Sequence, residues 1–300
     1  MTILERIDAL RQEKDAVILA HNYQAVEIQK LADITGDSLQ LSMQAQSSKA
    51  RLIVFCGVRF MAETAAILNP EAKVLLPAAG AGCPMADMIT VEQLRAFKAE
   101  HPGAPVVCYV NSSVAVKAES DVCCTSSNAV KILQSFPPGQ TILFVPDQHL
   151  GTWAAQQSGR QVIVWQGFCP IHQWGFTTAQ LKLLRKKHPG FTLLAHPECD
   201  EDIIEAADQV LSTGGMLKYV KQHDKLIIAT EATFIDYLRY LYPEKQIVAL
   251  NYRARCQNMR KTTVQHVLKA LEEEQFHIQV PPDIAAQALK ALHRMLELST

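Results

Sequence analysis

Three cysteines follow three apolar segments at nearly equal intervals, and this spacing constrains the fold of the chain more than any other feature. The segments are KVLLPAAGAGCPM, QVIVWQGFCPIH and QIVALNYRARCQNM, which contain Cys83, Cys169 and Cys256. Each apolar run has the length and the β-branched composition of a buried strand, so each cysteine follows the carboxyl end of a predicted strand. Intervals of 86 and 87 residues predict a repeated structure with one thiol in each copy.

A helical segment repeats at the same interval. TVEQLRAFKAEHPG at 90–103 aligns without a gap with TTAQLKLLRKKHPG at 177–190, and TILERIDALRQEKD at 2–15 has the same pattern. All three begin with threonine, a favourable N-cap. The segments at 90–103 and 177–190 carry glutamine three residues later, as in a capping box. Two further helix-like stretches and three apolar runs follow each segment, so helix and strand alternate three times before each cysteine.

This order of elements predicts an α/β fold. Strands that alternate with helices form parallel βαβ units, with helices on both faces of a small sheet. Near-continuous apolar strands fit that burial. We expect three pseudo-symmetric αβα units, each with a small parallel sheet, around a central site. The predicted domains are 2–89 with the C-terminal residues 263–300, then 90–176 and 177–262, and the two helices of the C-terminal segment are expected to pack on the first unit.

Composition and charge limit the classes of function. The 300 residues are 48% hydrophobic with a formal net charge of −1, which gives no reason to expect nucleic acid or an anionic membrane as a partner. No apolar run approaches the roughly 18 residues of a membrane span, and the N-terminus lacks a signal-peptide core. We therefore expect a cytoplasmic protein, with no membrane partner, whose eight cysteines are not a disulfide framework. Cys56 and Cys108 are expected to be buried as small hydrophobic residues.

Polar residues occupy equivalent positions at the end of the first predicted strand in each unit. Ligands of open parallel sheets bind beyond the carboxyl ends of the strands. A single polar residue at such a place usually satisfies local backbone groups. Here all six residues at two sets of positions can donate, accept or transfer a proton, which favours a shared site: His21, Tyr109 and His196, then Tyr23, Asn111 and Glu198.

A third set of equivalent positions carries hydroxyl groups, namely Ser38, Ser126 and Thr213. Each opens a helix-like stretch, where a hydroxyl most often serves as a cap worth about 1 kcal/mol. Three helix N-termini directed at one axis would also bind an anion through their free N–H groups and dipoles. Together with the neighbouring Ser212, these residues predict a small ligand that carries several negative charges.

The three repeated cysteines predict a metal centre. Soft thiolate ligands suit zinc, copper(I) or an iron–sulfur cluster. A cubane held by three cysteines keeps one iron free to bind substrate oxygen as a Lewis acid. His172, three residues after Cys169, is the alternative fourth ligand that would close a zinc site. We favour the cluster because a structural zinc rarely lies where sets of catalytic residues converge. Cys123, Cys124 and Cys199 lie near these sets, but the sequence demands no role for them.

Taken together, these residues resemble the quinolinate synthase family. The resemblance extends from about residue 17 to about residue 265, and no single generic motif carries it. Its motifs are AHNYQ, GDSL, FCGVRFMAETAAILNP, AGCPMAD, VNSSVAVKAESDVCCTSSNAV, PDQHLG, GFCPIH, AHPEC, STGGM, ATE and CQNM.

The resemblance implies three αβα domains around a [4Fe–4S] cluster held by Cys83, Cys169 and Cys256. It also implies condensation of iminoaspartate with dihydroxyacetone phosphate to quinolinate, with loss of phosphate and water, in de novo NAD biosynthesis. An L-aspartate oxidase or dehydrogenase is then the expected source of iminoaspartate. Some members carry a C-x-x-C pattern before the third cysteine. Leu250 and Arg253 stand at those places here, which disfavours a redox switch.

These expectations assign roles to the site residues. Glu198 is the only carboxylate in the repeated sets, so we expect it to be the general base, with Tyr23 and Tyr109 as further proton-transfer groups. The expected substrate ligands are His21, Ser38, Asn111, Ser126, His196, Ser212 and Thr213. Three alternatives stay open: a hydro-lyase of the aconitase type, a protein that only binds a phosphorylated metabolite, and a zinc protein.

Overall fold

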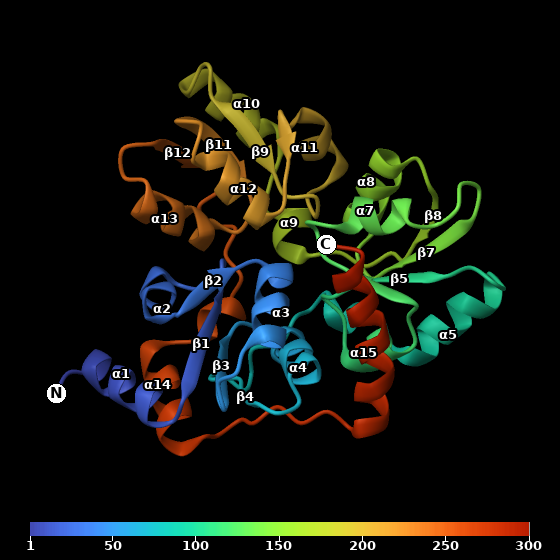
Figure 1. Cartoon of the computed structure of the whole chain (residues 1–300). Coiled ribbons are helices and arrows are strands. Elements are labelled where there is room, and N and C mark those ends of the chain that lie inside the picture. Colours follow the sequence, from blue (N-terminus) through green and yellow to red (C-terminus); the bar gives the residue numbers. More distant parts are fainter. Residues whose placement is uncertain (300) are drawn as a thin grey trace.

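The computed structural model describes residues 1–299 and contains three parallel sheets of four strands each (Figure 1). The strand orders are β2-β1-β3-β4, β6-β5-β7-β8 and β10-β9-β11-β12, so the same topology occurs three times in chain order. In Figure 1 the three sheets follow the colour scale from blue through green to orange, and they surround a common centre. The predicted α/β fold of three αβα units is confirmed.

Each sheet is surrounded by helices from its own part of the chain, here called the first, second and third unit. The first contains α1 (Ile3–Glu13), β1 (Ala16–His21), α2 (Val26–Leu31), β2 (Ile34–Gly36), α3 (Ser38–Ser47), β3 (Leu52–Cys56), α4 (Arg59–Leu68), β4 (Lys73–Leu75) and η1 (Ala86–Met88). The second contains α5 (Val91–Glu100), β5 (Val106–Tyr109), α6 (Val114–Ala118), β6 (Val122–Cys124), α7 (Ala129–Gln134), β7 (Thr141–Val145), α8 (Gln148–Ser158), β8 (Gln161–Val164) and α9 (Pro170–Trp174). The third contains α10 (Thr178–Lys187), β9 (Thr192–Ala195), α11 (Glu201–Ala206), β10 (Gln209–Val210), α12 (Thr213–Val220), β11 (Lys225–Ala229), α13 (Ala232–Leu241), β12 (Gln246–Ala249) and η2 (Met259–Lys261). The division into domains at residues 89/90 and 176/177 stays an interpretation.

The first helix of every unit begins with a capping box. In α1, α5 and α10 the N-cap threonine accepts a hydrogen bond from the third residue of the helix, whose side chain accepts one from the backbone N–H of the threonine. The first unit uses glutamate where the other two use glutamine. The repeated helix starts were thus correctly predicted. The pairs are Thr2 with Glu5, Thr90 with Gln93, and Thr177 with Gln180.

Helices cover both faces of the sheets, which explains their almost uninterrupted apolar strands. In the first sheet Leu19 and Ile53 face a core that includes residues of α3 and α4. Their neighbours Ile18 and Val54 face a second core, built with α1 and α14 (Val264–Glu273). Because consecutive strand residues point to opposite faces, burial of both faces requires apolar residues at every position.

One short strand in each unit was not predicted from the sequence. The short strands β2, β6 and β10 lie at the edge of each sheet and pair in parallel with β1, β5 and β9. They contain only two or three residues, which is too short for hydrophobic periodicity to reveal. Each occupies part of what the sequence indicated as a polar loop.

An aspartate anchors each of these edge strands to the central strand beside it. Asp33, Asp121 and Asp208 accept hydrogen bonds from the backbone N–H groups of Ile18, Val106 and Leu193, at 2.8, 2.7 and 2.7 Å. These aspartates recur at intervals of 88 and 87 residues. They form a further set of equivalent positions that the sequence analysis did not recognise, and their role is structural.

The C-terminal segment packs on two units. Helix α14 packs against α1 and β3, as predicted for the first unit. Helix α15 (Pro282–Glu297) instead packs mainly against α6 and β6 of the second unit, and also against α4 of the first (Figure 1). Leu292 and Met295 are fully buried there. Assigning the whole segment to the first unit therefore does not describe the packing of α15.

Replacement of Asp121 by alanine is expected to lower the free energy of unfolding by about 1–3 kcal/mol. The change leaves the buried N–H of Val106 without its acceptor. Asp121→Asn keeps an acceptor oxygen and should cost less. Urea unfolding followed by circular dichroism measures both, with Asp8→Ala, which removes only a surface ion pair, as the control. If Asp121→Ala unfolds like the control, the anchoring role is wrong.

Candidate active site and metal centre

The carboxyl ends of the three sheets converge on one cavity of about 230 Å³, lined by residues of all three units. Strand β1 ends at His21, strand β5 ends at Tyr109, and His196 directly follows β9. Parallel strands place all their carboxyl ends at one edge, so equivalent residues of the repeats meet. Twelve of the thirteen predicted site residues line the cavity: His21, Tyr23, Ser38, Cys83, Tyr109, Asn111, Ser126, Cys169, His196, Glu198, Thr213 and Cys256.

Ser212 is the exception among the predicted residues. Its hydroxyl caps α12 by accepting a hydrogen bond from the N–H of Gly215 at 3.1 Å, and it does not line the cavity. Ser38 and Thr213, in contrast, are the first residues of α3 and α12 and do not cap these helices. Their hydroxyls therefore remain at the cavity, and a substrate contact for Ser212 stays a prediction.

The three repeated cysteines come from the loops that follow β4, β8 and β12. Cys83, Cys169 and Cys256 are half-buried, and all three line the cavity. Burial raises the pKa of Cys83 to about 12, with the neighbouring Cys256 adding to the effect. Such thiols ionise at neutral pH only when a cation compensates the thiolate, which is the environment of a metal ligand.

The remaining cysteines are buried away from the cavity. Cys56, Cys108, Cys123, Cys124 and Cys199 have no exposed surface and do not line it. The predicted burial of Cys56 and Cys108 is confirmed. Cys123 and Cys124 are close in sequence to residues of the site, but both are buried in the edge strand β6.

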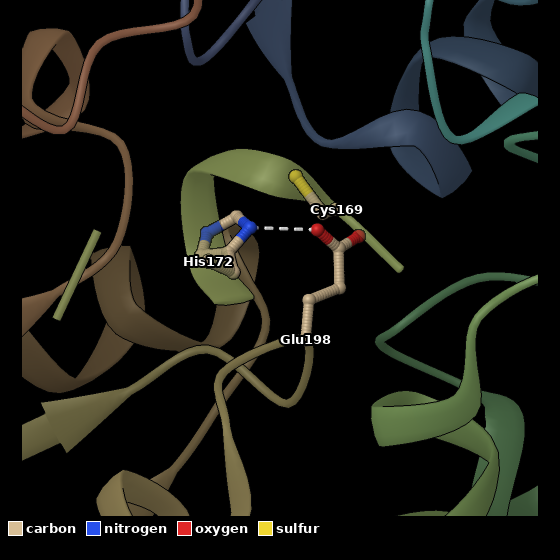
Figure 2. Close-up of side chains that lie close together, drawn as sticks. All are labelled: Cys169, His172 and Glu198. Atoms are coloured by element: carbon tan, nitrogen blue, oxygen red, sulfur yellow. Dashed lines mark ion pairs between the residues drawn. The ribbon is translucent and has the colours of Figure 1, made fainter. Parts of the chain in front are cut away.

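Cys169, His172 and Glu198 form a close group at the centre of the site (Figure 2). Cys169 precedes α9 and His172 lies one turn later on the same helix, whereas Glu198 comes from the loop after β9. Their ligand atoms all lie within 4.8 Å of one another, and no other group of three or more such residues does so within residues 1–299. These three side chains are therefore able to hold a metal ion.

Five side chains form a continuous chain of polar contacts across the cavity wall. The Tyr23 hydroxyl lies 2.7 Å from Thr230 Oγ1, which lies 2.9 Å from His172 Nε2. His172 Nδ1 lies 2.7 Å from Glu198 Oε2 (Figure 2), and the Tyr109 hydroxyl donates to Glu198 Oε1 at 2.5 Å. The three residues predicted to transfer protons are thus connected through two that were not: Thr230, and His172, which entered only as a zinc ligand.

The two histidines at equivalent positions make the same backbone contact. His21 Nδ1 accepts the N–H of Tyr23 at 3.1 Å, and His196 Nδ1 accepts the N–H of Glu198 at 3.4 Å. Burial lowers the pKa of His21 to about 4 and that of His196 to about 3, so both rings are neutral at pH 7. A neutral imidazole whose Nδ1 accepts carries its proton on Nε2. Each ring can therefore donate one hydrogen bond.

The protonation states of the other groups follow from burial and from Glu198. Burial alone would raise the pKa of Glu198, but His196, His172 and the Tyr109 hydroxyl outweigh it and hold the pKa well below its usual range. Burial and the charge of Glu198 raise the pKa values of Tyr23 and Tyr109 well above 10. At neutral pH the cavity thus contains a carboxylate beside two protonated phenols.

Asn111 offers a polar atom that the protein leaves unpaired. Its Oδ1 is buried at the cavity and has no hydrogen-bond partner among the described residues. A buried amide oxygen without a partner costs free energy unless a ligand or water satisfies it. This observation is independent of the repeat and also indicates a polar ligand.

The sequence analysis also missed Glu231 as a site residue. It caps α13, is fully buried, lines the cavity, and its Oε1 accepts the N–H of Cys256 at 2.9 Å. The residues that cap the helix after the second long strand are Val58, Asp147 and Glu231. These positions are 89 and 84 residues apart, so a gapless alignment does not match them.

A thiol-lined cavity with paired proton-transfer groups, at the carboxyl ends of three repeated parallel sheets, defines an α/β enzyme with a capacity for metal. Its family follows from similarity to known proteins. The sequence model of the family described as "Quinolinate synthetase A protein" matches residues 5–297. The chain belongs to this family of enzymes.

Curated relatives match over almost the whole chain. A "Quinolinate synthase" of Methanoregula boonei is 47% identical over 296 residues, covering 98% of this chain and 97% of the relative. One of Alkaliphilus metalliredigens is 48% identical over 299 residues, covering 99% of this chain and 98% of the relative.

In residues 1–299, no helix combines the length and the apolar character that crossing a membrane requires.

Because His21 and His196 are neutral in the folded protein, the free energy of unfolding is expected to rise with pH between about 4 and 6.5. An unfolded histidine takes up a proton near pH 6.5, whereas His21 does so only at about 4 and His196 at about 3. Within that window the unfolded state binds more protons, so acidification favours unfolding by about 1.4 kcal/mol per pH unit for each ring. Urea unfolding of metal-free protein at several pH values should show a slope that decreases in His21→Gln and again in His21→Gln/His196→Gln. A slope unchanged by both replacements would contradict the neutral state of these rings.

Proposed function

We propose that this protein is a quinolinate synthase that condenses iminoaspartate with dihydroxyacetone phosphate to quinolinate, releasing phosphate and water, in de novo NAD biosynthesis. The proposal places it in the cytoplasm, with an L-aspartate oxidase or dehydrogenase as the supplier of iminoaspartate. It rests above all on one observation: three thiols from three repeated loops and three proton-transfer groups line one cavity. The names of the curated relatives agree with it.

The donor set fits a [4Fe–4S] cluster held by Cys83, Cys169 and Cys256. Each thiolate of a cubane binds its own iron, so the sulfur atoms need not cluster as tightly as ligands of one ion. This agrees with the described chain, in which Cys83 and Cys256 do not join Cys169 in a group whose ligand atoms all lie within 4.8 Å. Such a cluster, with one iron free of cysteine, would supply Lewis-acid chemistry for the loss of a substrate oxygen as water.

The remaining cavity residues are suited to bind substrates that carry several negative charges. The Nε2–H groups of His21 and His196 donate hydrogen bonds, as does the hydroxyl of Ser126. Asn111 Oδ1, which has no partner among the described residues, can accept a hydrogen bond from an N–H or O–H of the substrate. The proposed substrate ligands are His21, Ser38, Asn111, Ser126, His196, Thr213 and Ser212, of which Ser212 does not line the cavity.

Glu198 is the proposed general base. Its carboxylate is ionised, buried and in contact with two potential proton carriers. One carboxylate oxygen faces His172 Nδ1 and the other accepts from the Tyr109 hydroxyl, while His172 and Thr230 connect the carboxylate with Tyr23. Tyr23 and Tyr109 keep their protons at neutral pH and are therefore suited to protonate a departing oxygen.

Product analysis of protein purified without air tests the proposal. Iminoaspartate generated in the assay, together with dihydroxyacetone phosphate, should yield quinolinate, with formation strictly dependent on the triose phosphate. Turnover of other hydroxy acids without triose phosphate would instead indicate a hydro-lyase. Colourless protein without iron would indicate the binding-protein alternative, and one zinc per chain would indicate a site at Cys169, His172 and Glu198.

The Glu198→Gln enzyme is expected to turn over about 10²–10⁴ times more slowly than the parent, because a positioned base contributes that much to rate. Glutamine keeps the shape and can still accept from Tyr109, so the folded state and iron content should persist. The turnover number under saturating substrates, with iron content as the control, measures this. Normal turnover by this variant would exclude Glu198 as the base.

Each of the replacements Cys83→Ser, Cys169→Ser and Cys256→Ser is expected to abolish stable cluster binding, since an alcohol is a far poorer ligand for iron than a thiolate. Iron and sulfide content and the visible absorption of anaerobically purified protein measure the loss. Cys124→Ser is the matched control, because Cys124 is buried in β6 outside the cavity. A variant that retains the full iron content would remove its residue from the ligand set.

A further inference from the structure

Three acidic residues line the cavity, namely Asp37, Glu198 and Glu231, and its lining contains no lysine or arginine. Glu198 is the proposed base, and Glu231 accepts hydrogen bonds from the backbone of Thr233 and Cys256. Asp37 has no role in the mechanism described above. A carboxylate at the edge of a cavity that is proposed to bind anionic substrates requires an explanation.

Asp37 lies where two helices from different units begin. It caps α3, and its Oδ1 accepts the N–H of Gln40 at 3.0 Å. Across the boundary with the third unit, Asp37 Oδ2 lies against Gly214 in the first turn of α12. The backbone N–H groups of Leu39 and Gly214 favour the ionised carboxylate and lower its pKa. Asp37 is only 7% exposed. One carboxylate therefore occupies the N-terminal ends of both α3 and α12.

Gly214 of α12 lies very close to the carboxylate of Asp37. A Cβ atom added to Gly214 would lie 2.5 Å from Asp37 Oδ2, closer than two such atoms can approach. A side chain at position 214 would therefore force the Asp37 carboxylate to move, although Gly214 has no unusual backbone angle. Gly214 thus leaves room for the carboxylate at the start of α12.

The repeats show that capping alone does not require a negative charge here. Asp37 corresponds to Thr125 and Ser212, at intervals of 88 and 87 residues. Ser212 caps α12 with a hydroxyl, and serine, asparagine and aspartate cap helices about equally well. The first unit therefore carries a charge at a position where a neutral residue serves in the third.

We propose that Asp37 determines how the anionic groups of the substrate are placed. Two helix N-termini form a favourable position for an anion, and the protein fills that position with its own carboxylate. Phosphate and carboxylate groups are then repelled from the corner between α3 and α12 and directed towards Ser126 of the second unit. This inference rests on the proposed function, because it concerns the substrates of that cavity.

Near Asp37, the hydroxyls of Ser38 and Thr213 face neutral parts of the ligand. Thr213 Oγ1 already accepts from Asn22 Nδ2 at 3.0 Å, so it keeps its own proton for donation to an uncharged oxygen or nitrogen. Burial raises the pKa of Asp37, against the effect of its three backbone donors and of Lys218. The test is therefore made at pH 8, which favours the ionised carboxylate.

Binding of inorganic phosphate to anaerobically purified protein, measured by titration calorimetry at pH 8 and low ionic strength, tests the proposal without turnover. Asp37→Asn removes the charge and keeps the shape. Asp37→Ser introduces the residue found at the equivalent place in the third unit and leaves the N–H of Gly214 free. Both variants should bind phosphate at least tenfold more tightly than the parent protein, because repulsion is removed and helix N–H groups become available.

Asp283→Asn is the matched control. Asp283 lies in the first turn of α15 and is exposed, so this change alters the net charge equally without touching the cavity. Thermal unfolding of both Asp37 variants should stay close to that of the parent, since asparagine and serine also cap.

Unchanged phosphate affinity in either Asp37 variant, or an equal gain in Asp283→Asn, would overturn the proposal. Asp37 would then act only as a contact between the first and third units. Quinolinate formation by the parent protein tests the proposed function separately, so failure of one inference does not imply failure of the other.

Discussion

The parallel direction of the strands is the constraint on which the site depends. In all three sheets every ladder pairs strands in parallel, so each unit delivers its polar loops at a single edge. No residue of the cavity needs to be near another in sequence. Tyr109 and Glu198 are 89 residues apart and in hydrogen-bond contact, because each follows the first long strand of its own unit. The cavity is thus a consequence of topology.

How much of the site the sequence predicts depends on whether a residue obeys the repeat. His21, Tyr109 and His196 were found because their spacing is constant, and so were the three cysteines. Thr230 and Glu231 were missed because they follow β11, where the interval from the second unit is shorter. The short edge strands were missed for a different reason, since two or three residues carry no periodic signal.

The scaffold repeats, but its chemistry does not, and the physical reason is charge. Three carboxylates at the three positions equivalent to Glu198 would repel one another in a buried cavity, and some would be neutral. The units instead place Tyr23, Asn111 and Glu198 there, so one negative charge is surrounded by donors. His172 breaks the symmetry further, because its two nitrogens connect Glu198 with Thr230. Sequence repeats reveal such positions, whereas roles follow from the differences between copies.

Backbone N–H groups stabilise two of the three carboxylates that line the cavity. Glu231 accepts from the N–H groups of Thr233 and Cys256, and Asp37 accepts from Gln40 at the start of α3 and lies against Gly214 at the start of α12. These carboxylates are compensated within the protein, so they need no lysine or arginine at the cavity. They also use donors that a ligand would otherwise reach. The donors left for an anionic ligand are those without such an internal partner, chiefly Ser126 and the two histidine Nε2–H groups. A neutral lining of this kind binds an anion through directed hydrogen bonds, which makes the position of each carboxylate a matter of specificity as well as stability.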